Sequence, residues 1–254
     1  MSNAGSVLLA ALVLISASAL PSIAQSADAD QTIRRMDVAM YPESYFSVIT
    51  MATVQPSGES TSMTFEVSYK HGVGSRMEIT APARSRGIRF LQKDNFLWLF
   101  NPRSGSRRAI RLSARDSFQG SAFSNSDVSE TEFSGRYHAA VLRHEPIDVD
   151  GSSRSCTVIE ANAKDRSSPY AKVVLWIDAQ SFVPYRMDYY ARSGLLFKRM
   201  TLSRIREIAG RERPTFYRME SFDQPGLHSD VSIDTLEARD DLPDRLFTEA
   251  DLTQ

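Results

Sequence analysis

Apolar and polar residues alternate along most of the chain, and this two-residue period constrains the fold more than any other feature. Within 62–69 four apolar side chains alternate with four polar ones, and 76–80 repeats the pattern. Such alternation is typical of a β-strand with one buried face, because successive side chains point to opposite sides of a sheet. Further strands are expected at 96–100, 108–112, 157–160, 171–177, 186–190, 195–206, 216–222 and 227–236.

Turn residues separate these segments at short intervals, as in Pro56-Ser57-Gly58 and Asn101-Pro102. About ten strands at this spacing, with little helix between them, predict a mainly β chain built on one large antiparallel sheet. A sheet of that size usually curls or closes upon itself. Neither a long linker nor a break in composition divides the chain, so we expect a single domain.

Short helical segments are expected beside the sheet. Residues 28–41 carry apolar side chains three and four positions apart, as on one face of a helix. A second short helix is expected near Asp127. The chain closes with a predicted helical turn in 242–252, whose Leu246, Phe247 and Leu252 are expected to face the body of the protein.

The N-terminal segment is typical of an export signal. Residues 7–15 are all apolar, and Ser22 and Ala24 fit the small-residue positions before a signal-peptidase cut. We therefore expect a signal peptide at 1–24 and a single exported domain at 25–254, free in the periplasm. An uncleaved anchor is the less favoured alternative, because serine and proline interrupt the stretch before it reaches the ~20 apolar residues of a spanning helix.

Charge is nearly balanced over the chain but unevenly distributed. The formal net charge of −1 gives no general attraction to nucleic acid, and we expect no nucleic-acid partner. Residues 84–115 contain eight arginines and one lysine against one aspartate, whereas 220–254 contain ten acids and two arginines. Two alternatives stay open: solvated faces that partly neutralise each other, or a surface that steers a partner. In the second alternative the candidate docking residues are Arg103, Arg107, Arg108 and Arg111.

Motifs of known chemistry are scarce. The four histidines lie on unrelated segments, and His144-Glu145 lacks the second histidine of a zinc-protease motif. Gly72-Val73-Gly74 is typical of a hairpin turn and not of a phosphate-binding loop. Cys156, the one cysteine, excludes an internal disulfide and is better explained as a buried apolar residue than as a nucleophile. We expect no metal, no cofactor and no enzymatic activity; a secreted hydrolase is the least favoured hypothesis.

The apolar content of the predicted sheet exceeds what so few helices can cover. Either the sheet closes around a filled core, or it curls around a cavity lined by apolar side chains. Trp176 shares its face with Lys172 and Asp178, which leaves its direction open. The candidates for the cavity wall are Met63, Phe65, Phe96, Trp98, Phe100, Leu175 and Trp176.

The order of several short motifs resembles the LolA-like family of outer-membrane lipoprotein-sorting proteins. In 82–102 a proline, Gly87 and an aromatic strand with Trp98 follow one another as in that family. Residues 118–124 are similar to the family's Gly-Ser-Asp-Phe-Ser element, although Ala122 replaces the usual aspartate, and Asn125-Ser126 replace a Tyr-Glu pair before Asp127. The resemblance continues over most of 27–252 through Asp150-Gly151, Cys156, Trp176-Ile177-Asp178, Pro184, Tyr189-Tyr190, Lys198, Asp241-Leu242-Pro243-Asp244, Phe247 and Leu252.

The resemblance implies a half-open antiparallel β-barrel of the LolA/LolB type with short N-terminal and covering helices. It implies a periplasmic carrier or chaperone that holds acyl chains of a lipoprotein, a lipid or another hydrophobic ligand and moves it toward the outer membrane. An inner-membrane transporter, an outer-membrane acceptor or an export pump would be its partner. The alternative is a periplasmic ligand-sensing or adaptor module that docks on a membrane partner through the basic stretch 84–115.

Overall fold

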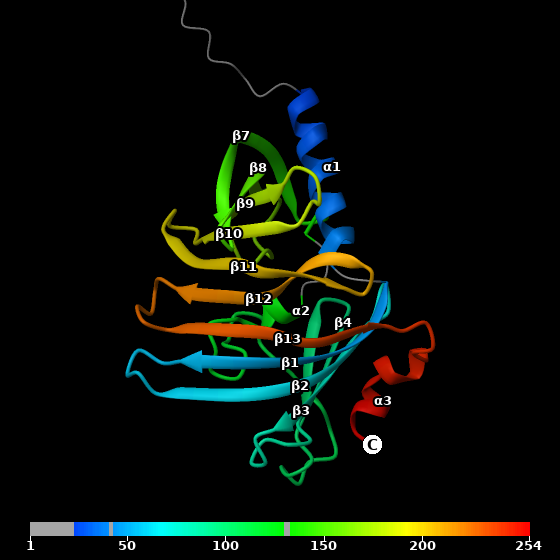
Figure 1. The fold of residues 1–254 in the computed structure, drawn as a ribbon. Coiled ribbons are helices and arrows are strands. Elements are labelled where there is room, and N and C mark those ends of the chain that lie inside the picture. Colours follow the sequence, from blue (N-terminus) through cyan, green and yellow to red (C-terminus); the bar gives the residue numbers. More distant parts are fainter. Residues whose placement is uncertain (1–22, 41–42, 130–132) are drawn as a thin grey trace, which may run out of the picture.

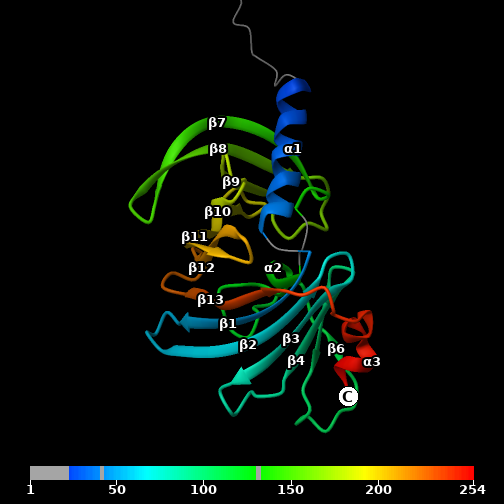
Figure 2. The same cartoon turned by 45° about the vertical axis from the view of Figure 1, so that its right-hand side comes forward.

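A computed structural model describes residues 23–40, 43–129 and 133–254 of the chain, and Figures 1 and 2 show its fold from two directions. The helical elements are α1 (Ile23–Met40), α2 (Asn125–Ser129), the 3₁₀ turn η1 (Asp244–Phe247) and α3 (Glu249–Leu252). The strands are β1 (Ser44–Val54), β2 (Ser60–Lys70), β3 (Gly74–Ala81), β4 (Arg89–Lys93), β5 (Phe96–Phe100), β6 (Ile110–Arg111), β7 (Tyr137–Val149), β8 (Ser152–Ala163), β9 (Lys172–Asp178), β10 (Pro184–Tyr190), β11 (Leu196–Ile208), β12 (Arg211–Ser221) and β13 (His228–Ala238). None of the described helices is long and apolar enough to cross a membrane.

All strands belong to one 13-stranded sheet, in the order β6-β5-β4-β3-β2-β1-β13-β12-β11-β10-β9-β8-β7. The strand pairs are antiparallel, so the sheet consists of two meanders, β1–β6 and β7–β13, joined where β1 pairs with β13. The sheet curls strongly, which is clearest in Figure 2. Because β6 and β7 are its edge strands, it is an open, half-barrel sheet and not a closed barrel. The predicted mainly β, antiparallel fold is confirmed.

Tight turns account for the meanders. At Asp150-Gly151, between β7 and β8, both residues have positive φ, at 54° and 76°. This is the backbone of a type I′ turn, whose twist matches that of two antiparallel strands. Aspartate tolerates this left-handed conformation and glycine adopts it without a steric penalty. The dipeptide therefore fixes the register in which Val149 faces Ser152.

The alternating pattern underestimates the number of strands, because its segments leave out β1, β4 and the edge strand β7. The sequence of 113–145 predicts an irregular segment, yet β7 begins at Tyr137. A β-bulge between Val141 and Arg143 interrupts the two-residue period. Pro146 also argues against a central strand, but an edge strand tolerates a residue that cannot donate a ladder hydrogen bond.

The helix α1 packs on one face of the sheet, which we call the inner face. Ala29, Ile33 and Met36 are buried at spacings of four and three and contact the apolar side chains of β7–β10. The prediction of a helix with one apolar face is confirmed for the described residues. Tyr41, the predicted last residue of the helix, and residues 1–22, which hold most of the predicted signal peptide, lie outside the described residues.

The C-terminal segment, η1 and α3, covers the opposite, outer face of β4 and β5. Phe247 and Leu252 are fully buried there, as the sequence predicts, in a cluster with Leu91, Trp98 and Phe100. Charged groups tie the acidic segment to neighbouring strands. The pairs are Lys70 Nζ to Asp244 Oδ1 at 2.7 Å, Arg76 Nε to Asp251 Oδ2 at 3.6 Å, and Arg89 Nη1 donating to the Leu252 carbonyl at 2.8 Å.

We predict that Phe247→Ala lowers the free energy of unfolding by about 3–5 kcal/mol, because a buried aromatic ring is lost and a cavity is left. Urea denaturation followed by tryptophan fluorescence measures the change. Phe222→Ala is the matched control, since that ring is 43% exposed, and its effect is expected to stay below about 1 kcal/mol. Equal losses in both variants would contradict the assignment of Phe247 to the core.

Candidate functional site

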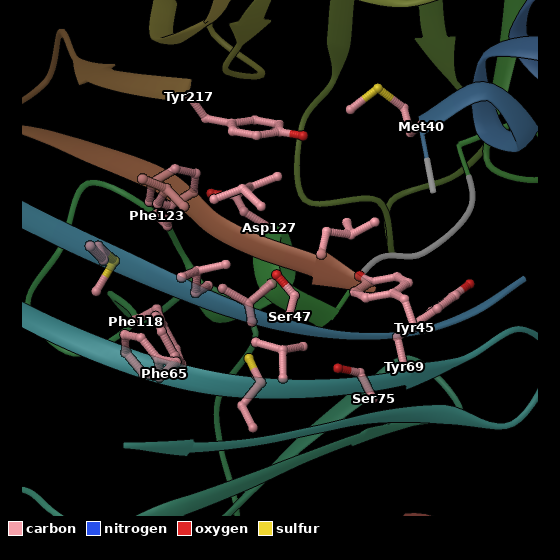
Figure 3. Close-up of a pocket in the computed structure, with 18 of the residues that line it drawn as sticks. Met40, Tyr45, Ser47, Phe65, Tyr69, Ser75, Phe118, Phe123, Asp127 and Tyr217 are labelled. Carbon is pink, nitrogen blue, oxygen red and sulfur yellow. The ribbon is translucent and has the colours of Figure 1, made fainter. Parts of the chain in front are cut away.

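An apolar cavity of about 270 Å³ lies on the inner face, where the two meanders meet (Figure 3). Its walls come from β1–β3 on one side and β11–β13 on the other, closed by a segment before and within α2. The lining residues are Met40, Tyr45, Ser47, Ile49, Met51, Phe65, Val67, Tyr69, Ser75, Met77, Phe118, Phe123, Asp127, Val128, Met200, Tyr217, Val231, Ile233 and Leu236. Most are aliphatic, aromatic or methionine side chains, a surface suited to a flexible apolar ligand.

Residues 113–129, which we call the covering segment, cross the inner face between the two meanders. Phe118 packs against Phe65 and Phe90, with ring centroids 5.8 and 5.0 Å apart, and so joins the covering segment to the sheet. The backbone N–H of Ala122 donates to Ser229 Oγ at 3.0 Å, which fixes the middle of the covering segment on β13. Phe123 packs between the apolar clusters of the two meanders, so its ring forms part of the cavity wall.

A buried ion pair holds the end of the covering segment. Lys198 Nζ lies 3.2 Å from Asp127 Oδ2, and the two side chains are only 9% and 8% exposed. The Tyr170 hydroxyl donates to Asp127 Oδ1 at 2.7 Å, and the backbone N–H of Ser124 donates to Oδ2 at 2.7 Å. Burial, together with the negative charge of Asp127, raises the pKa of Tyr170 well above its usual range. Tyr170 therefore keeps its proton and remains a donor to the carboxylate.

Among the predicted cavity residues, Phe65 lines the cavity. Met63 is partly buried against the same apolar cluster without forming the wall. Leu175 is fully buried in the cluster beneath α1, at the part of the inner face that the helix covers. The structure therefore brings Met63 and Phe65 together near the cavity and places Leu175 in the filled part of the core.

The prediction that Phe96, Trp98 and Phe100 line the cavity is corrected. These residues share one face of β5, and that face is the outer one, where the C-terminal segment covers Trp98 and Phe100. Phe96 is 45% exposed. The alternate residues Leu97 and Leu99 face the inner cluster instead. Both faces of β5 are apolar because both are covered, so alternation alone does not identify the inner one.

Trp176 also lies outside the cavity. Its ring packs with the apolar cluster around Cys156 and has the guanidinium groups of Arg143 and Arg186 over it, at 5.8 and 4.2 Å from the ring centroid. Its indole N–H donates to the carboxylate of Glu145. Its place in the structure is therefore explained by cation–π packing and one hydrogen bond, and its assignment to the cavity wall is corrected.

The four arginines proposed for docking lie in or beside the exposed hairpin β5–β6. Arg103 donates to the carbonyls of Ala83 and Arg84, at 3.0 and 2.6 Å, and so stabilises the neighbouring loop. Arg111 lies over the Phe96 ring at 4.6 Å. Within the described part of the chain, no carboxylate forms an ion pair with Arg103, Arg107, Arg108 or Arg111.

Cys156 is fully buried in β8, as the sequence predicts. Burial, with smaller contributions from the charges of Asp178 and Glu145, raises its pKa to about 12. A thiol with that pKa stays protonated at neutral pH and is a poor nucleophile. Among the described residues, no three histidine, cysteine, aspartate or glutamate side chains gather where they could hold a metal ion.

Fold and site together define a class: a single curled, open antiparallel sheet whose apolar inner face is covered only in part by short segments. A LolA superfamily protein from Nitrosomonas europaea is 31% identical in sequence. The match covers 87% of this chain and 98% of that protein, with a TM-score of 0.75. The chain belongs to the LolA superfamily.

Two further solved structures share the fold. A DUF1329 family protein from Desulfovibrio piger is 22% identical over 90% of this chain and 99% of its own, with a TM-score of 0.80. A domain from Vibrio parahaemolyticus named for outer membrane lipoprotein sorting is 20% identical over 90% of this chain and 100% of its own, with a TM-score of 0.78. A family model described only as an uncharacterized protein matches residues 72–254. No curated protein matches the chain.

Sequence reasoning alone missed the covering segment as part of the site. The sequence feature that points to this segment is the element at 118–127, which resembles the family motif and includes Asp127. That resemblance names Lys198 separately, and only the fold shows that the two residues meet. The apolar residues of β1 that line the wall, Ile49 and Met51, carry no motif that distinguishes them from other core positions.

We predict that Asp127→Asn lowers the free energy of unfolding by about 3–5 kcal/mol, because the Lys198 ammonium is left buried without its counter-charge. The double variant Asp127→Asn with Lys198→Met removes both charges. It is expected to lose less stability than the sum of the two single variants, and a double-mutant cycle in urea measures the difference. Strict additivity would show that the two groups do not interact.

Proposed function

We propose that this protein is a periplasmic carrier that binds the acyl chains of a lipoprotein, a lipid or another hydrophobic ligand and moves it through water toward the outer membrane. The observation that carries the proposal is the apolar cavity at the junction of the two meanders. Its ligand would come from an inner-membrane transporter or export pump and pass to an outer-membrane acceptor. The proposal needs no catalytic group, cofactor or metal.

The energetics of an acyl chain support this role. Each CH₂ group exposed to water is unfavourable by about 0.8 kcal/mol, so a chain of a dozen such groups gains about 10 kcal/mol when it is fully buried. The rings and thioethers around the cavity offer that burial, and methionines such as Met51, Met77 and Met200 adapt to different chain shapes. The predicted signal peptide at 1–24 supports a periplasmic location.

The variant Val231→Trp tests the cavity. Val231 lines it from β13, so an indole at this position fills space that the ligand would occupy. We predict that the affinity for N-phenyl-1-naphthylamine, an apolar fluorescent probe, falls by about tenfold or more, which corresponds to about 1.4 kcal/mol. A fluorescence titration measures the affinity, and native mass spectrometry of the purified protein shows whether a co-purified lipid is lost in the variant.

Val38→Trp is the matched control, because Val38 is 69% exposed on α1 and is not among the residues that line the cavity. Its probe affinity should equal that of the unsubstituted protein. Both variants should unfold cooperatively. If the unsubstituted protein binds neither probe nor lipid, the filled-core alternative holds and the carrier proposal is wrong.

A docking role for the β5–β6 hairpin is the second candidate function. The observation that favours it is the set of arginines without carboxylate partners among the described residues, beside Ile110, which is 56% exposed. Exposed cations around an apolar side chain suit an acidic surface on a membrane partner. In this role the protein would sense its ligand or act as an adaptor instead of carrying cargo.

We predict that reversing Arg107, Arg108 and Arg111 to glutamate abolishes recovery of an acidic membrane partner from solubilised envelopes and leaves probe binding unchanged. The reason is that a rim charge contributes mainly to recognition and to its salt dependence. A triple reversal at Arg34, Arg206 and Arg211, three exposed arginines on other elements, is the control. Equal recovery with both triple variants would rule out docking through the hairpin.

A further inference from the structure

A second cavity, of about 330 Å³, lies on the other side of the covering segment from the apolar one. Its wall carries serine hydroxyls together with the cationic side chains of Arg115, Arg192 and Lys198, and the wall of the apolar cavity has no cationic side chain among its lining residues. The lining residues are Arg115, Ser117, Ser121, Ala122, Phe123, Ser124, Ser126, Pro169, Tyr170, Ala191, Arg192, Phe197, Lys198, Ser221, Asp223, Gln224 and Leu227. We call it the polar cavity.

The two cavities meet at the covering segment. Phe123 lines both of them. The buried ion pair stands at the same boundary, because Asp127 lines the apolar cavity while its partners Lys198 and Tyr170 line the polar one. Figure 3 shows Phe123 and Asp127 from the apolar side. A polar and an apolar chamber are therefore separated by a few side chains.

The charge around the polar cavity favours an anion. Lys198 is neutralised by Asp127. The guanidinium of Arg192 donates to the carbonyls of Arg166 and Ser168, at 2.8 and 3.3 Å, and within the described residues neither Arg192 nor Arg115 forms an ion pair with a carboxylate. Asp223 is the remaining acid of the wall and accepts from Ser221 Oγ at 2.5 Å. Apart from the neutralised Lys198, the wall therefore has two guanidinium groups and one carboxylate, which leaves a net positive charge.

We propose that the polar cavity binds the anionic head group of an amphiphile whose alkyl chain occupies the apolar cavity. This inference rests on the proposed carrier function and narrows its ligand to one with a negative group, such as a phosphate or carboxylate, at the end of the chain. Arg115 and Arg192, both exposed, contact the anion at the rim. The hydroxyls of Ser117 and Ser121 already donate to the carbonyls of Ser121 and Phe123, and those of Ser124 and Ser126 bond each other, so the guanidinium groups are the partners of the anion.

The physical reason is that each chamber suits one half of such a molecule. An anion stays out of an apolar cavity because losing its hydration without a partner is costly. Guanidinium groups compensate for that loss through charge-assisted hydrogen bonds, and Arg is well suited to phosphate and carboxylate. The ligand chain would pass Phe123, the residue that the two walls share.

The test compares two ligands with the same chain, dodecyl phosphate and 1-dodecanol, in displacing N-phenyl-1-naphthylamine from the full protein. We expect the unsubstituted protein to prefer dodecyl phosphate. In the variant Arg115→Gln with Arg192→Gln, the affinity for dodecyl phosphate falls about tenfold, while that for dodecanol is unchanged. Arg206→Gln with Arg211→Gln, two exposed arginines of β11 and β12 that line neither cavity, is the matched control and leaves both affinities unchanged.

The outcomes separate this inference from the carrier function. If both ligands bind and the double variant weakens neither or both equally, the head-group site is wrong and the carrier function stands. If neither ligand displaces the probe from the unsubstituted protein, the carrier function fails, and the head-group site with it. Arg115→Gln alone, which leaves the hydrogen bonds of Arg192 in place, gives the same comparison if the double variant is unstable.

Inorganic phosphate distinguishes a head-group site from a site for a free anion. Titration calorimetry with phosphate alone is expected to show binding much weaker than that of dodecyl phosphate, because the chain supplies most of the free energy. Tight binding of inorganic phosphate that Arg115→Gln abolishes, without a preference for dodecyl phosphate over dodecanol, would overturn the inference.

Discussion

The pairing of the first strand with the last is the interaction on which the rest of the structure depends. β1 and β13 are antiparallel neighbours from Tyr45 opposite Ala238 to Val54 opposite His228. This ladder converts two local meanders into one sheet with a continuous inner face. A bulge between Val48 and Ile49 lies in this seam, and bulges increase local twist. The walls of the apolar cavity come from strands on both sides of the β1–β13 pairing, so the cavity depends on that pairing.

The inner face is longer than the elements that cover it. α1 fills the part over β7–β10, and the covering segment crosses the middle. The cavity remains between them, on the side of β1–β3. The buried contact of Asp127 with Lys198 ties the covering segment to β11, on the far side of the seam. Separating a buried ion pair leaves a charge without its partner in an apolar environment, which is costly in free energy. The contact therefore gives the covering segment a defined position.

The sequence predicts the class of fold well because its two-residue period is a local signal that needs no knowledge of long-range contacts. The edge strand β7 escapes this signal because a bulge and Pro146 interrupt the period. Where both faces of a strand are apolar, however, the two-residue period does not show which face points inward. In β5 the residues Leu97 and Trp98 are both apolar, and the outer one, Trp98, is partly buried because the C-terminal segment folds back over it.

By itself, the sequence determined a mainly β sheet of short antiparallel strands, a helix with one apolar face, a buried Cys156 and a helical C-terminal turn. Only the tertiary structure decided which face of each strand looks inward, and that Asp127 meets Lys198 between an apolar and a polar cavity. Periodicity reports the environment of a residue relative to its immediate neighbours. A cavity is the space left between distant segments, and its position follows from how those segments pair and pack.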